Sequence, residues 1–162
     1  MSKSAQSFLV RRTCTRKSNK ADEQGSHPLE SYRDKPAYVL LGDPGAGKTA
    51  SFKREAEEAD GVYIRARDFV VFKLDTTMHG KPLFIDGLDE MPAADGDRRH
   101  PLDRIRERLI GIGKPPFRLS CREADWLGES GREALELISK DIIALHLDPL
   151  SDGDITEILR HK

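Results

Sequence analysis

The sequence has little of what a secreted or membrane-spanning protein needs. Its 162 residues include two cysteines, Cys14 and Cys121, and neither has a partner at the spacing of a zinc site or a redox motif. No apolar run approaches the roughly eighteen residues that cross a bilayer, and the N-terminus lacks the apolar core of a signal peptide. We therefore expect a cytoplasmic protein with reduced thiols and no membrane partner.

Apolar residues are also scarce. They make up 37% of the chain, against 34% charged residues, which predicts one modest core and a highly solvated surface. The net charge of −1 argues against a dedicated polyanion binder, so nucleic acid is not an expected partner. The first 20 positions nevertheless contain basic residues and no acidic residue to balance them: Lys3, Arg11, Arg12, Arg16, Lys17 and Lys20. We predict a weakly ordered, polar and basic leader over residues 1–35, with contact to nucleic acid or an acidic partner as the alternative to a solvated tail.

A phosphate-binding loop follows the apolar strand that we predict over Ala37–Leu41. Its glycines let the backbone curl so that several N–H groups point toward bound phosphates, and Lys48 supplies a positive charge to the β and γ phosphates. The hydroxyl of Thr49 is a ligand for Mg²⁺, and the helix that begins here adds its positive N-terminal end. The residues expected to bind the nucleotide are Gly42, Asp43, Pro44, Gly45, Ala46, Gly47, Lys48 and Thr49. The chain is thus predicted to bind a nucleoside triphosphate.

The second half of the predicted site lies at the end of another apolar run. Leu83–Asp86 reads as a buried parallel strand that delivers a carboxylate to the edge of the sheet where ligands collect. Asp86 is therefore expected to hold Mg²⁺ through water, opposite Thr49. Asp89 and Glu90 follow closely and are candidates to orient or deprotonate an attacking water.

The pattern Asp86-Gly87-Leu88-Asp89-Glu90 resembles the signature of NACHT-type NTPases, which belong to the STAND class of signalling ATPases. Three further stretches are similar to that family: 41–49, Leu119-Ser120-Cys121-Arg122, and 145–151. The resemblance covers residues 36–159. It implies that the strand ending at Cys121 is a sensor strand, inserted between the metal strand and the phosphate-loop strand. It also implies that Arg122 reports whether the γ-phosphate is present.

Strands alternate with helices along the chain, which predicts an α/β, three-layer P-loop NTPase fold with a mainly parallel sheet of about five strands flanked by helices. The predicted strands are Ala37–Leu41, Val62–Ala66, Leu83–Asp86, Phe117–Cys121 and Ile142–Leu147. The predicted helices are Lys48–Ala59, Arg98–Ile110, Glu133–Ser139 and Ser151–Leu159, with helix and strand competing over Asp68–Asp75. Residues 36–162 form the NTPase core, which we expect to be incomplete at its C-terminus because the family continues into further domains.

These features predict an enzyme that binds Mg·ATP and hydrolyses it slowly, with ATP favoured over GTP. The resemblance implies a nucleotide switch in defence-type signalling, with self-association or partner proteins acting through domains that are missing here. No arginine finger can be identified in the sequence. Two alternatives stay open: a non-hydrolysing module that binds partner proteins in a nucleotide-dependent way, and an ATPase that assists nucleic-acid transactions.

Overall fold

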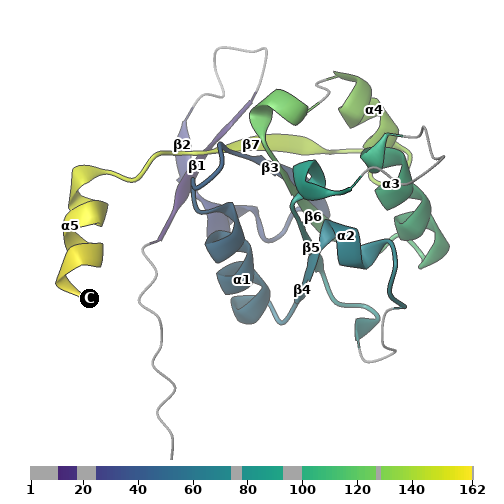
Figure 1. The fold of residues 1–162 in the computed structure, drawn as a ribbon, viewed down its shortest axis with the longest axis horizontal. Coiled ribbons are helices and arrows are strands. Elements are labelled where there is room, and N and C mark those ends of the chain that lie inside the picture. The colour runs from purple at the N-terminus through teal and green to yellow at the C-terminus, as the bar shows by residue number, and fades with distance from the viewer. Residues whose placement is uncertain (1–10, 18–24, 74–77, 93–99, 127–128, 162) are drawn as a thin grey trace, which may run out of the picture.

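The computed structural model describes residues 11–17, 25–73, 78–92, 100–126 and 129–161 (Figure 1). Its strands are β1 (Thr13–Arg16), β2 (Ser26–Pro28), β3 (Ala37–Leu41), β4 (Val62–Arg65), β5 (Leu83–Asp86), β6 (Phe117–Cys121) and β7 (Ile143–Leu147). Its helices are α1 (Lys48–Glu58), α2 (Ala66–Phe69), α3 (Pro101–Gly111), α4 (Glu129–Glu136) and α5 (Asp152–Arg160). Short 3-10 turns are η2 (Leu29–Tyr32), η4 (Leu88–Glu90) and η5 (Glu123–Asp125). The predicted α/β fold is confirmed.

The strands form one sheet in the order β2-β1-β7-β3-β6-β5-β4. The five strands from β7 to β4 are parallel, and β6 lies between β3, which precedes the glycine-rich loop, and β5, which ends at Asp86. The position of β6 between β3 and β5, which the family resemblance implied, is therefore confirmed. This order brings the C-terminal ends of β3, β6 and β5 side by side, where polar side chains can meet over α1.

Each face of the sheet carries its own apolar cluster. On one face, residues of β3, β5 and β6 pack against α2, α3 and α4, with Phe69, Ile105 and Leu135 fully buried. On the other face, α1 covers the sheet through Phe52, whose ring lies edge-on against Tyr38 and Phe84. Because β3 is covered on both sides, all five of its residues are buried, as its continuous apolar sequence predicts.

The expected weakly ordered leader is wrong for residues 11–17 and 25–35; residues 1–10 and 18–24 lie outside the described residues. This segment contains β1 and β2, which add to the sheet as antiparallel strands beside β7. The carboxylate of Asp148 anchors them by accepting hydrogen bonds from Thr13, Thr15 and Ser26. Short polar strands of this kind carry no apolar alternation, so their pairing partners, not their own sequence, decide their structure.

Other predicted elements begin elsewhere. The helix predicted over Glu133–Ser139 forms as α4, which begins at Glu129 and ends at Glu136. The segment predicted over Asp68–Asp75 forms the short helix α2 and a turn, in which the N–H groups of Val71 and Phe72 donate to the carbonyl of Asp68; residues 74 and 75 lie outside the described residues. Residues 98 and 99, predicted to open a helix, also lie outside them. The described part of that helix, α3, has His100 as its N-cap, with Nδ1 accepting the N–H of Leu102.

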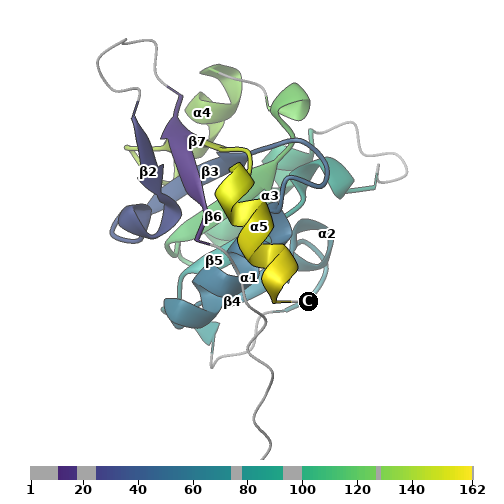
Figure 2. The same cartoon turned by 90° about the vertical axis from the view of Figure 1, so that its left-hand side faces the viewer.

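Helix α5 stands at the end of the molecule away from α3 and α4 (Figures 1 and 2). It begins with the predicted capping box, in which Ser151 and Asp154 exchange side-chain and backbone hydrogen bonds. None of its residues is buried, and Leu159 is 62% exposed. Among the residues that the structure describes, no helix is long and apolar enough to span a membrane.

Gly111 is the last residue of α3 and Gly113 follows the helix, and the pair offers a test of the backbone geometry. A Cβ at Gly111 or at Gly113 would meet nothing within 4 Å, but only Gly113 has a positive φ, of +94°. We expect Gly111→Ala to raise the free energy of unfolding by about 0.5 kcal/mol through reduced chain entropy. Gly113→Ala should lower it by about 1 kcal/mol, because an L side chain is strained there. Urea unfolding of the two variants measures this, and shifts of the same sign would contradict it.

Candidate nucleotide site

The loop between β3 and α1 has the geometry of a phosphate cradle. Gly45 and Gly47 have φ angles of +81° and +97°, which the loop needs in order to curl and which other residues rarely adopt. Helix α1 starts at Lys48 directly after this turn, and no side chain caps its first N–H groups. These donors and the positive end of the helix therefore remain for an anion.

Side chains from three elements meet around this cradle. They line a cavity of about 460 Å³ formed by Asp43, Pro44, Gly45, Ala46, Gly47, Lys48, Thr49, Ala50, Lys53, Asp86, Gly87, Asp89 and Glu90. The structure thus brings together the predicted residues of the loop and of the segment 86–90. Gly42 is not among the lining residues, but its carbonyl oxygen contacts Lys48. That oxygen and the carbonyl of Asp43, at 3.3 Å, accept hydrogen bonds from the Lys48 ammonium. The ammonium consequently lies over the loop, beside the place where phosphates would bind.

Asp86 is held at the end of β5 by hydroxyl groups. Its Oδ2 accepts hydrogen bonds from Thr49 Oγ1 and from Tyr63 Oη, each at 2.6 Å, and its Oδ1 accepts one from Ser120 Oγ. The Ser120 hydroxyl in turn accepts the Gly87 N–H at 2.8 Å. Burial raises the pKa of Tyr63, and its hydrogen bond to Asp86 raises it further, so this hydroxyl stays a donor at neutral pH.

This donor set fits a magnesium-bound triphosphate. Mg²⁺ prefers hard oxygen ligands and keeps several of its waters, so one hydroxyl and one carboxylate suffice when phosphates supply the rest. Thr49 and Asp86 provide that pair within one cavity, next to the Lys48 ammonium. Among the described residues, no group of three or more His, Cys, Asp or Glu side chains is placed to hold a metal by itself.

The structure separates the two acids that follow Asp86. Asp89 is engaged: its Oδ1 accepts the backbone N–H of Arg122 at 3.2 Å, and its Oδ2 lies 3.4 Å from the guanidinium Nε. Glu90 is exposed and lies against Gly87, where a Cβ would come within 3.0 Å of its carboxylate. Arg122 is not among the described residues that line the cavity, and its guanidinium also pairs with Asp125 at 2.6 Å, which raises its pKa. Its role as a reporter of the γ-phosphate stays a prediction.

Arg12, which no sequence motif marks as a site residue, contacts the phosphate loop from the segment before β1. Its guanidinium comes from the segment just before β1 and donates to the carbonyl of Ala46 at 2.6 Å and to that of Asp148 at 2.7 Å. Burial lowers the pKa of this side chain. A Cβ on Gly47 would lie 2.4 Å from its Nη1, so the glycine is required by this contact as well as by its φ angle. No motif signals this residue, because the contact depends on β1 joining the sheet.

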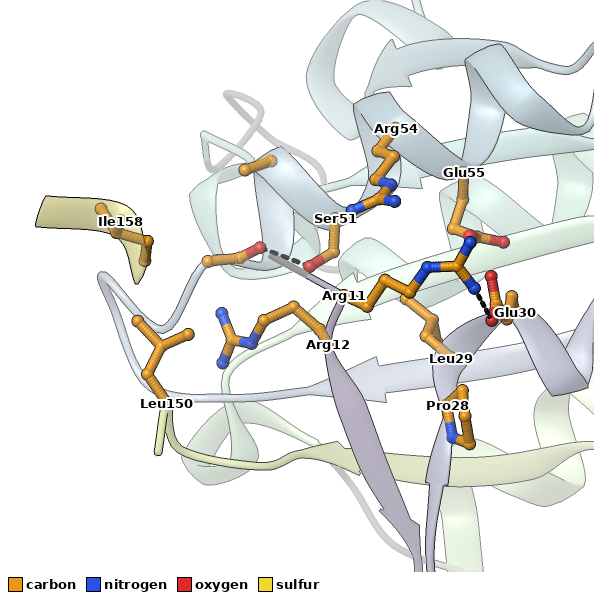
Figure 3. Close-up of a pocket in the computed structure, with 12 residues that line it drawn as sticks. Arg11, Arg12, Pro28, Leu29, Glu30, Ser51, Arg54, Glu55, Leu150 and Ile158 are labelled. Carbon is orange, nitrogen blue, oxygen red and sulfur yellow. Dashed lines mark hydrogen bonds and ion pairs between the residues drawn. The ribbon is translucent and has the colours of Figure 1, made fainter. Parts of the chain in front are cut away.

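Arg12 also forms one wall of a second cavity, of about 180 Å³ (Figure 3). Its lining is mainly apolar at Pro28, Leu29, Leu150 and Ile158, with polar side chains around it. The other lining residues are Arg11, Glu30, Gly47, Ala50, Ser51, Arg54 and Glu55. Gly47 and Ala50 line both cavities, so the two cavities are neighbours at the start of α1.

Comparison with known proteins leaves the family open. The sequence matches no protein-family profile and no curated protein. Solved structures that are similar include an unliganded sugar kinase from Janibacter sp. HTCC2649, 20% identical with a TM-score of 0.41, and a gluconokinase from Sinorhizobium meliloti 1021, 22% identical with a TM-score of 0.40. Each covers 78% of this chain, which spans 66% and 64% of theirs, less than two thirds. At these TM-scores neither likeness indicates a substrate, and membership of the NACHT family stays a prediction.

Proposed function

We propose that this chain binds Mg·ATP and hydrolyses it slowly, as the nucleotide switch of a NACHT-like signalling ATPase. The observation that carries the proposal is the meeting of Lys48, Thr49 and Asp86 around one glycine-built cavity. The arrangement supplies N–H donors, one ammonium group and one oxygen pair for a metal. A turn with chance similarity to the motif would have no reason to gather all three.

The cavity residues have different roles in the proposed hydrolysis. The loop N–H groups and Lys48 bind and orient the phosphates. Thr49 and Asp86 would hold Mg²⁺, which would supply positive charge to the phosphoryl oxygens. Glu90 accepts the proton of the attacking water, since its carboxylate lines the cavity and is exposed to solvent. Asp89 instead positions the strand end that carries Arg122, because its two oxygens are occupied by that residue.

The second cavity is our candidate for the base of the nucleotide. It adjoins the phosphate cradle at Gly47 and Ala50, and apolar side chains with a few polar groups are typical of sites for planar heterocycles. The guanidinium of Arg12 lies at its wall, where it can stack on or hydrogen-bond to such a ring (Figure 3). The proposed nucleotide therefore extends from the loop toward α5.

A pair of neighbouring residues on α5 tests this placement. Ile158 lines the second cavity, whereas Leu159 is 62% exposed and does not. We expect Ile158→Ala to weaken ATP binding about fivefold, near 1 kcal/mol of lost apolar contact, and Leu159→Ala to change it by less than twofold. Binding of inorganic tripolyphosphate, which has no base, should be unaffected in both. Equal losses for ATP and tripolyphosphate would place the base elsewhere.

The proposed function itself is tested on the unaltered chain. Calorimetry with Mg·ATP, Mg·GTP and each nucleotide in EDTA measures binding and its metal dependence, and phosphate release measures hydrolysis. We expect binding that is strengthened by Mg²⁺, with slow turnover. No heat with any magnesium nucleotide would refute the proposal, and tight binding without phosphate release would favour the non-hydrolysing interaction module.

A further inference from the structure

The carboxylate of Asp86 is oriented from a strand that carries none of the recognised motifs. Tyr63 lies on β4, beside β5, and is in register with Phe84, two residues before Asp86. Because side chains alternate along strands, Tyr63, Phe84 and Asp86 project toward the face that α1 covers. The Tyr63 hydroxyl thereby reaches Asp86 Oδ2 at 2.6 Å.

The ring that carries this hydroxyl is itself held in place. It packs, half-buried, against the apolar cluster that contains Phe52 and Phe84. The ammonium of Lys53, a residue that lines the phosphate cavity, also lies 5.3 Å from the ring centroid. The hydroxyl position is therefore fixed by contacts that do not include Asp86.

The three hydroxyl donors divide into two kinds. Thr49 belongs to the predicted metal site, and its oxygen can face a metal while its hydrogen still points at Asp86. Tyr63 on β4 and Ser120 on β6 lie outside the predicted ligands, and each donates to a different oxygen of the carboxylate, so together they fix its orientation. Groups that bind a ligating carboxylate in this way commonly control metal affinity.

We propose that Tyr63 is a positioning residue that fixes the orientation of the Asp86 carboxylate for a magnesium-bound nucleotide. This inference rests on the proposed function, because it concerns the same site. It assigns to β4 a part in metal binding, and it assigns to Lys53 the part of holding the tyrosine ring.

The test is the Mg²⁺ dependence of ATP binding in the Tyr63→Phe variant, measured by calorimetry. Phenylalanine keeps the ring, its packing and its contact with Lys53, and removes only the hydroxyl. We expect the Mg²⁺ concentration for half-maximal enhancement of ATP binding to rise about tenfold. ATP binding in EDTA should stay within twofold of the unaltered chain. Tyr32→Phe, which removes a hydroxyl from a buried ring of the same cluster away from the cavity, should shift neither value.

Three results would overturn the inference in distinguishable ways. An unchanged Mg²⁺ midpoint in folded Tyr63→Phe shows that the hydroxyl does not position Asp86, while the proposed function stands. Equal weakening with Mg²⁺ and in EDTA shows a general distortion of the site. A parent chain that binds no nucleotide refutes the proposed function and this inference with it. If the phenylalanine variant folds poorly, Tyr63→Leu takes its place. It also removes the ring, so its ATP affinity in EDTA measures that loss, and the Mg²⁺ midpoint measures the loss of the hydroxyl.

Discussion

Replacing Lys48 by alanine is expected to weaken Mg·ATP binding about 100-fold, near 3 kcal/mol, because hydrogen bonds from a charged group to phosphate are among the strongest that a protein makes. The ammonium already lies over the loop, where the carbonyls of Gly42 and Asp43 accept its hydrogen bonds. A bound phosphate would therefore find the charge in place. Calorimetry with Mg·ATP measures the loss.

A matched variant separates this local effect from a change in total charge. Lys81→Ala removes the same charge from the surface, where the side chain pairs with Asp60 at 3.2 Å and is absent from the cavity lining. We expect Lys81→Ala to change ATP affinity by less than twofold. Undiminished binding by folded Lys48→Ala would remove the main support for the phosphate cradle.

The second large effect is expected at Glu90. The Glu90→Gln variant keeps the size and hydrogen-bonding capacity of the side chain but cannot accept a proton, so phosphate release should fall by about 10²- to 10⁴-fold. Affinity for Mg·ATP should change by less than threefold, because the phosphates are bound by the loop and not by this residue. Single-turnover phosphate release, compared with calorimetric affinity, distinguishes the two quantities.

Asp89 is the natural comparison, since the sequence alone could not tell the two acids apart. In the structure its oxygens are occupied by Arg122, and Asp89→Asn retains an acceptor for the Arg122 N–H. We expect turnover to fall only a few-fold in this variant. If Asp89→Asn lost as much activity as Glu90→Gln, the roles that we assign to them would have to be exchanged.

What could be predicted from the sequence is what depends on local spacing. A single tight turn joins β3 to α1, so the loop glycines, Lys48 and Thr49 must lie close together. Asp86 could be placed because an apolar parallel strand ends there, and parallel strands end at the same edge of a sheet. The position of β6 between β3 and β5 followed from the family resemblance and not from the residues themselves.

What could not be predicted depends on contacts between distant segments. Tyr63 reaches Asp86 only because β4 pairs with β5 in one particular register, and nothing in its neighbourhood marks it as functional. Arg12 supports the phosphate loop only because β1 adds to the edge of the sheet. Polar residues that serve such contacts look like surface residues in a sequence, since their burial and partners are set by the tertiary fold.

The antiparallel strands also change what the sheet presents to other molecules. Without β1, the long outer side of β7 would offer unpaired N–H and C=O groups that could recruit a strand from another chain and start aggregation. With both strands in place, the outermost strand on this side of the sheet is β2, which has three residues and ends in Pro28, a residue without an N–H to donate. The segment that carries Arg12, β1 and β2 therefore also leaves a short edge strand on this side of the sheet, which disfavours pairing with a strand of another chain.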